Sequence, residues 1–250
     1  ANKQFYAFYA TRLINYEGHV NEQLSYAISN DGVHFTKQKP NPFYTFAPGY
    51  SKRDFRDPKV IVDRDGIFHL FVSSKKEEAV LQRTEGVLVH LTSKNLKDWD
   101  VELPVLTGQG SVPECPDYFY WNGWYYLIYG DRGNTFYVKS RNKYGPWQEP
   151  SHQTLNEDFS NVAKTAEFVD GRRIAAAWIP SRKDNKDSMR EIFGGNALFR
   201  EVIQHDDGSL GTKFPPEMIP ATGAPLKLNV KYDSMTSNEN KSYLVRAPNG

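Results

Sequence analysis

Short aromatic segments of β-strand character recur at similar intervals along this chain. Counted between one reference residue in each segment, Phe5, Phe68, Tyr125 and Ile174, the intervals are 63, 57 and 49 residues. Asp-Gly or Asn-Gly pairs, which favour tight hairpin turns, stand shortly before the last three of these residues. Repeats of this length with about four strands each are typical of β-propeller blades.

A second recurring feature is a polar turn that begins with serine and ends with an aromatic residue. It occupies residues 29–35, 93–99 and 140–147. No segment shows a long apolar period of 3.6 residues, so we predict an all-β chain. A β-sandwich or a β-helix stays open as an alternative, although a sandwich would show turns every 8–12 residues without the longer period.

Composition excludes several classes of function. The 31 basic and 30 acidic residues give a net charge of +1, without the basic excess of a nucleic-acid-binding protein. No apolar run is long enough for a membrane span. The single cysteine, Cys115, excludes an intrachain disulfide framework, and the six histidines lack metal-ligand spacing. We therefore predict no metal and no other cofactor, and the oligomeric state stays open.

Two carboxylates have the same place relative to the repeat. Asp57 precedes Phe68 by 11 residues, and Glu114 precedes Tyr125 by 11. This offset predicts that both acids lie at equivalent positions on the innermost strands of successive blades, where they would face one funnel and support acid/base chemistry. Alternatively, each acid only caps a turn beside a proline. Two acids in register favour the site.

Several motifs resemble glycoside hydrolase family 32, the group of invertases, inulinases and levanases. Residues 55–60, Phe-Arg-Asp-Pro-Lys-Val, resemble its Arg-Asp-Pro motif, and residues 114–117, Glu-Cys-Pro-Asp, resemble its Glu-Cys motif. Ala-Lys-Thr at 163–165 and the segment 172–178 resemble later strands. The resemblance extends over roughly residues 1 to 220, and the order and spacing of the motifs make it specific.

The resemblance implies a five-bladed β-propeller, usually followed by a β-sandwich, that hydrolyses β-fructofuranosides with retention of configuration. Glu114 would be the acid/base, and Asp57 would bind fructosyl hydroxyls and stabilise the transition state. Arg56, Cys115, Lys164 and Trp178 are the substrate-binding candidates. Three of them have a plainer alternative: a salt bridge for Arg56, a core position for Trp178, and packing beside Glu114 for Cys115, which has no histidine placed to activate it.

One departure from the family pattern concerns the nucleophile. The family's Asn-Asp-Pro-Asn-Gly motif is absent, and no aspartate precedes Asp31, which itself lies in a polar turn. Counted backwards from the Glu-Cys motif, residues 1–50 match the second blade without its innermost strand. We therefore expect the first blade, with the nucleophile, before residue 1, and we expect the isolated chain to be inactive. A degenerate propeller without covalent chemistry is the alternative.

The predicted organisation is a propeller catalytic domain of about three and a half blades over residues 1–219. Residues 220–250 are predicted to form a linker or the start of a C-terminal β-sandwich. The predicted function is hydrolysis of a carbohydrate substrate of the sucrose, inulin or levan type. A propeller that binds glycans without cleaving them, or a furanosidase acting on arabinan or xylan, is the alternative. The polymeric substrate class predicts an extracellular or periplasmic location.

Overall fold

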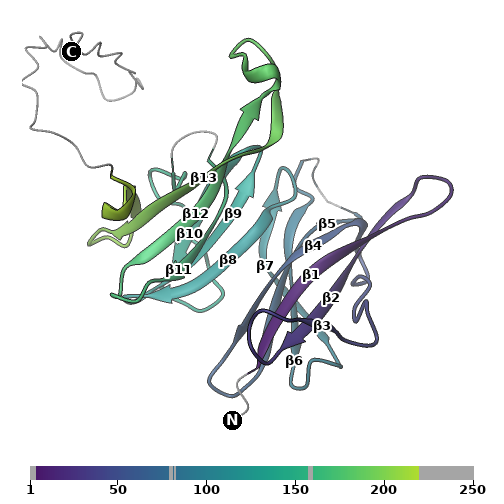
Figure 1. Cartoon of the computed structure of the whole chain (residues 1–250). Helices are drawn as coiled ribbons and strands as arrows, with labels where there is room; N and C mark the ends of the chain where they lie inside the picture. Colours follow the sequence, from purple (N-terminus) through teal and green to yellow (C-terminus); the bar gives the residue numbers. More distant parts are fainter. Residues whose placement is uncertain (1–3, 79–80, 82, 157–159, 220–250) are drawn as a thin grey trace, which may run out of the picture. The chain divides into compact units, whose positions relative to one another are not determined.

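The computed structural model describes residues 4–78, 81, 83–156 and 160–219, and almost all of their regular structure is β-strand (Figure 1). The described residues up to Met218 belong to one compact unit. Residues 220–250, for which we predict a linker or the start of a sandwich, lie outside the described residues. In the described part of the chain, no helix has the length and apolar character needed to cross a membrane.

The strands form four antiparallel sheets in which neighbours in sequence pair with each other. The first sheet contains β1 (Phe5–Ile14), β2 (Val20–Ser29) and β3 (Thr36–Lys37). The second contains β4 (Tyr50–Val62), β5 (Phe68–Lys76), β6 (Gly86–Ser93) and β7 (Asp100–Gln109). This up-and-down order is that of a propeller blade.

The third and fourth sheets repeat the pattern. The third contains β8 (Glu114–Trp121), β9 (Trp124–Asp131) and β10 (Asn134–Ser140). The fourth contains β11 (Asn161–Glu167), β12 (Arg173–Arg182), β13 (Glu191–Gln204) and β14 (Leu210–Lys213). Two short 3₁₀ helices, η1 (Lys183–Asn185) and η2 (Pro216–Met218), interrupt the β12–β13 hairpin and follow β14.

Strand register confirms the repeat. Each reference aromatic lies opposite the serine that opens the next polar turn: Phe5 opposite Ser29, Phe68 opposite Ser93, and Tyr125 opposite Ser140. The hydroxyl of each serine accepts backbone N–H groups of its turn at 2.9–3.2 Å. β1 is therefore the counterpart of β5 and β9, the second strands of their sheets. Among the described residues, no strand takes the innermost place of the first sheet, so the four sheets form a partial propeller.

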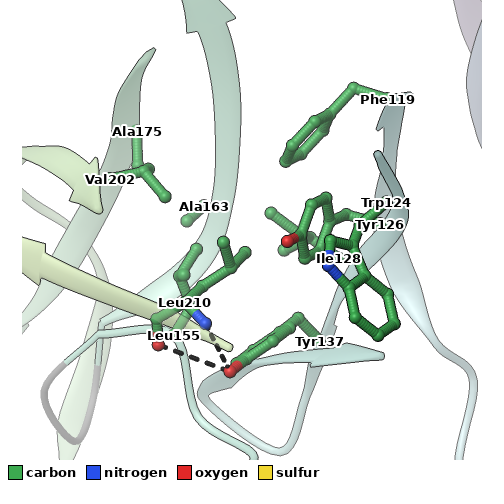
Figure 2. Close-up of a cluster of buried hydrophobic side chains, with 10 residues drawn as sticks. All are labelled: Phe119, Trp124, Tyr126, Ile128, Tyr137, Leu155, Ala163, Ala175, Val202 and Leu210. Carbon is green, nitrogen blue, oxygen red and sulfur yellow. Dashed lines mark hydrogen bonds between the residues drawn. The ribbon is translucent and has the colours of Figure 1, made fainter. Parts of the chain in front are cut away.

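Continuous apolar runs arise because the middle strands are buried on both faces. Along β9, Tyr126 and Ile128 contribute to one core, whereas Leu127 and Tyr129 contribute to another. Successive side chains of a strand point to opposite faces, so one strand supplies both cores. The first of these cores fills the space between the third and fourth sheets (Figure 2).

The same kind of core separates every pair of successive sheets. Residues of β2 and of β4 to β6 form the core between the first and second sheets, and residues of β5 to β10 form the one between the second and third. In Figure 2 the hydroxyl of Tyr137 accepts the N–H of Leu210 at 2.8 Å and so ties β10 to β14. These cores hold the innermost strands β4, β8 and β11 next to one another.

Candidate active site

Each innermost strand that carries a motif contains a β-bulge at the same place. The pairing shifts between Arg56 and Lys59 in β4, between Glu114 and Asp117 in β8, and between Asn161 and Lys164 in β11. The residue after the first of each pair has a left-handed backbone, with φ of 56° at Asp57, 48° at Cys115 and 47° at Val162. This conformation is uncommon for Asp and Cys and an outlier for a β-branched residue, and such strain is concentrated at functional sites.

The bulges correct one sequence prediction. By strand register Glu114 is equivalent to Arg56, and Cys115 is equivalent to Asp57. The prediction that Asp57 and Glu114 occupy equivalent positions is therefore wrong by one residue. The equal 11-residue offset arises because the β4–β5 hairpin is longer by one residue: Val62 pairs with Phe68, whereas Tyr120 pairs with Tyr125.

Arg56 connects the two predicted catalytic acids. Its Nη2 donates to Oε1 of Glu114 at 3.1 Å. Its Nη1 donates to Glu22 at 3.0 Å and to Asp54 at 2.7 Å, and its Nε lies 3.7 Å from Oδ2 of Asp57. One guanidinium group therefore contacts four carboxylates, which come from three sheets.

The charge of Arg56 is held firmly by this arrangement. Burial lowers its pKa, but hydrogen bonds to Asp54, Glu114 and Glu22 outweigh burial and raise the pKa above its ordinary value. Arg56 is thus a permanent cation beside Glu114. The ion pairs predicted as the alternative for Arg56 are present, and Asp57 lies within ion-pair distance of the same group.

Asp57 reaches the neighbouring strand through its bulge. Its Oδ2 accepts the backbone N–H of Cys115 at 3.0 Å, which places Asp57 directly beside the Glu-Cys motif. Burial, and then the charges of Asp57 and Glu114, raise the pKa of the Cys115 thiol to about 12. The thiol therefore stays protonated, as expected for a packing residue and not for a nucleophile.

A cavity of about 550 Å³ opens beside Glu114. Its wall includes Glu114 from β8, Asn161 from β11, and Trp178 from β12, together with Arg132 and Arg190 from hairpins. The Glu114 side chain is 42% exposed, so its carboxylate is accessible to a ligand. Asp57 does not line this cavity and adjoins it through the Asp57–Cys115 hydrogen bond.

Lys164 and Trp178 reach the site from the fourth sheet. Nζ of Lys164 donates to the carbonyl oxygen of Pro116 at 3.2 Å, and its charge counteracts the upward shift of the Cys115 pKa. The half-buried Trp178 contributes to the cavity wall, as its predicted role requires. All six predicted site residues therefore lie on β4, β8, β11 and β12, in or beside one region.

Sequence reasoning missed a second ion pair next to this region. Nζ of Lys59 lies 2.6 Å from Asp117, and Asp117 also accepts the N–H and hydroxyl of Thr165 at 2.8 and 2.7 Å. Burial raises the pKa of Asp117, but Lys59 and Thr165 outweigh it, and the pKa lies below its ordinary value. Lys59 and Asp117 both lie inside the motifs at residues 55–60 and 114–117, and this was the sequence signal that could have identified the pair. Glu22 belongs to no motif.

The residues that the structure describes contain no group of three or more His, Cys, Asp and Glu side chains that could hold a metal ion.

Comparison with known proteins places this geometry in a family. Residues 1–212 match the model of the "Glycosyl hydrolases family 32 N-terminal domain". A sucrose-6-phosphate hydrolase of Zymomonas mobilis is 30% identical over 195 residues, which cover 68% of this chain and 36% of that protein. A levanase of Bacillus subtilis is 39% identical over 107 residues, which cover 41% of this chain and 14% of the levanase.

Solved structures share the fold. A β-fructofuranosidase of Bombyx mori superposes with a TM-score of 0.67 at 19% identity, over 86% of this chain and 49% of that one. The chain thus spans about half or less of the length of these proteins. Because the family model covers most of the sequence, from residue 1 to residue 212, the chain belongs to glycosyl hydrolase family 32.

Proposed function

We propose that this chain supplies the acid/base and fructosyl-binding residues of a retaining glycosidase that cleaves β-fructofuranosides. The observation that carries the proposal is the hydrogen bond from Arg56 to Glu114, at the wall of a cavity and beside Asp57. The family match supports the class of reaction.

Glu114 serves both steps of the proposed reaction. In the first step its protonated carboxyl gives a proton to the glycosidic oxygen as the bond to the fructosyl carbon breaks. A carboxylate nucleophile, proposed to lie on a strand outside this sequence, takes the fructosyl group. In the second step Glu114 removes a proton from water, which attacks the fructosyl carbon and releases fructose. Because Arg56 binds Oε1, the other oxygen carries the proton.

Asp57 positions the fructosyl group in this proposal. It accepts the Cys115 N–H on Oδ2, which fixes the carboxylate while leaving acceptor capacity for sugar hydroxyls. Such contacts accelerate the reaction when they strengthen as positive charge develops on the sugar. Trp178, which lines the same cavity as Glu114, offers an aromatic surface to the sugar, and Lys164 adds a donor near Cys115.

Sucrose, inulin and levan are the proposed substrates. Relatives described as a sucrose-6-phosphate hydrolase and a levanase support this range. The match to family 32 favours it over arabinan or xylan. A polymeric fructan would place the protein outside the cytoplasm, and that location stays a prediction.

Substitution of Glu114 by glutamine tests the acid/base role in the intact protein. Loss of a general acid/base lowers turnover by about 10²–10⁴-fold. We expect that loss on sucrose, inulin and levan, with the folded state retained by circular dichroism. Glu102→Gln is the matched control, because Glu102 accepts the Thr92 hydroxyl in the second sheet, away from the Arg56 cluster.

A substrate with an activated leaving group sharpens this test. Such a substrate needs no acid in the first step, so added azide should restore turnover of the Glu114→Gln variant by replacing water in the second. Unchanged turnover of the variant on all three sugars would show that Glu114 is not the acid/base. Sugar binding without release of fructose by the unmodified protein would instead favour the glycan-binding alternative.

A further inference from the structure

A buried carboxylate lies behind the candidate active site, on a strand with no family motif. Glu22, on β2, has a side chain that is only 4% exposed. It accepts Nη2 of Arg12 at 2.7 Å, Nη1 of Arg56 at 3.0 Å, and the backbone N–H of Phe55 at 3.3 Å. Burying a carboxylate is costly unless it is paired, so these donors fix its position.

Among the contacts of Glu22, the one with Arg56 leads to Glu114. A guanidinium group is planar, so fixing one nitrogen constrains the direction of the others. Glu22 and Asp54 hold Nη1 of Arg56, and Nη2 of the same group contacts Glu114. Because Glu22 belongs to the first sheet and Glu114 to the third, Arg56 links the two across β4.

The charges around Arg56 set its influence on Glu114. Glu22 on β2, Asp54 and Asp57 on β4, and Glu114 on β8 face the guanidinium group. Arg12 on β1 stands behind Glu22, and Lys164 on β11 stands beyond Cys115. Glu22 is thus the buried negative charge that offsets Arg56 on the side away from Glu114.

We propose that Glu22 is a positioning residue that orients Arg56 toward Glu114 and limits how strongly Arg56 favours the ionised form of Glu114. This inference rests on the proposed function, in which Glu114 must carry a proton in the first step. An arginine 3.1 Å from a carboxylate favours ionisation. Glu22, a second and buried anion on the same guanidinium group, offsets part of the positive charge that Glu114 faces.

The first test is the pH dependence of kcat/KM for sucrose in the intact protein. In Glu22→Gln, Arg56 loses a buried anionic partner and favours ionised Glu114 more strongly. The alkaline limb of the profile, which reports loss of the proton from the acid, should move to lower pH by about one unit. Such a shift lowers kcat/KM about tenfold on the alkaline side. Glu22→Asp keeps the charge, so its alkaline limb should lie close to that of the unmodified protein.

A second variant, Arg12→Gln, should shift the alkaline limb in the opposite direction. Arg12 is 60% exposed and pairs with Glu22, so Arg12→Gln removes a cation without opening the core. Glu22 then offsets Arg56 more fully, and the alkaline limb should move to higher pH by a few tenths of a unit. This variant keeps the proposal testable should Glu22→Gln fail to fold.

Glu201→Gln separates a positioning role from a structural one. Glu201 is also a largely buried carboxylate with two basic partners, Lys213 at 3.0 Å and Arg172 at 3.7 Å, but it lies in the fourth sheet away from Arg56. We expect it to change stability and leave the pH profile in place. Opposite shifts in the Glu22 and Arg12 variants would support the proposal.

The proposal for Glu22 would be overturned by an unchanged alkaline limb in folded Glu22→Gln. Shifts of the same sign in Glu22→Gln and Arg12→Gln would overturn it as well. Failure of the proposed function gives a different pattern, because Glu114→Gln would then keep normal turnover.

Discussion

Two ion pairs join β4 to β8 at equivalent positions of the repeat, yet they differ in almost every other respect. Arg56 and Glu114 stand on one side of the bulges, and Lys59 and Asp117 stand on the other. The first pair has a contact of 3.1 Å and the second one of 2.6 Å. The same strand register therefore produces an arginine–glutamate pair and, three residues along each strand, a lysine–aspartate pair.

The exposure of the acid and the number of carboxylates on the base separate the two pairs. The Asp117 side chain is 1% exposed and is enclosed by Lys59 and Thr165. The Glu114 carboxylate opens to a cavity, and its arginine is shared with other carboxylates. We call Lys59–Asp117 the sealed pair because its acid is buried, and Arg56–Glu114 the open pair because its acid borders the cavity. The proposed acid/base role of Glu114 requires such an accessible carboxylate. Position in the repeat alone does not assign function.

Removing Asp117 should give the largest change in stability. Asp117→Ala leaves Lys59 and the groups of Thr165 without their buried partner, and loss of one member of a buried pair costs about 3–5 kcal/mol. We expect a fall of that size in the free energy of unfolding, measured by urea titration. Glu114→Gln should change it by less than about 1 kcal/mol, as exposed ion pairs contribute little.

A double-mutant cycle isolates the sealed pair. Lys59→Met removes the other charge, so the double variant with Asp117→Ala should be more stable than the sum of the single changes implies. A larger loss of stability in Glu114→Gln than in Asp117→Ala would contradict the prediction that the Lys59–Asp117 pair contributes more to stability.

The acid dependence of stability should follow His90, a buried histidine of β6. Burial, and then the charge of His69, lower the pKa of His90 to about 4. An unfolded histidine has a pKa of about 6.5, so below that pH the unfolded chain takes up a proton that the folded chain does not. Stability is therefore fully present above about pH 6.5 and is lost as the pH falls toward 4, by about 3 kcal/mol.

Urea midpoints measured between pH 7 and 4 check this loss. His90→Phe should flatten the dependence, since the variant has no imidazole to protonate at that position. An equal slope in His90→Phe and in the unmodified protein would assign the loss to other groups. The pH dependence of kcat/KM, by contrast, should depend on the Arg56–Glu114 pair. Its midpoint should therefore differ from that of the pH dependence of stability.

The sequence predicts the repeat well because its signals are local. A reference aromatic and the serine opposite it lie in the same sheet, and their spacing reflects one hairpin, as with Phe68 and Ser93. The motifs likewise placed Asp57 and Glu114 on neighbouring innermost strands. Their register failed by one residue, because counting back from a hairpin also counts any extra residue in its turn.

Features that depend on packing between sheets were beyond sequence reasoning. Glu22 is 34 residues from Arg56 and meets it only because the first and second sheets pack together. Nothing in the residue types of Cys115 or Val162 indicates a left-handed backbone, since both types favour extended conformations. The bulges are fixed by contacts such as the one from Asp57 to the Cys115 N–H, which form only in the folded chain.

The smallest expected effect concerns Cys115, which lies between the two pairs. With a thiol pKa of about 12, roughly one molecule in 10⁴ carries the thiolate at pH 8. Iodoacetamide should therefore modify Cys115 far more slowly than it modifies free glutathione, and Cys115→Ser should change turnover by less than about threefold. Mass spectrometry during alkylation, with fructose release followed in parallel, measures both. Fast alkylation with a matching loss of activity would show that Cys115 is a reactive thiol. It would contradict the assignment of Cys115 as a packing residue between the two ion pairs.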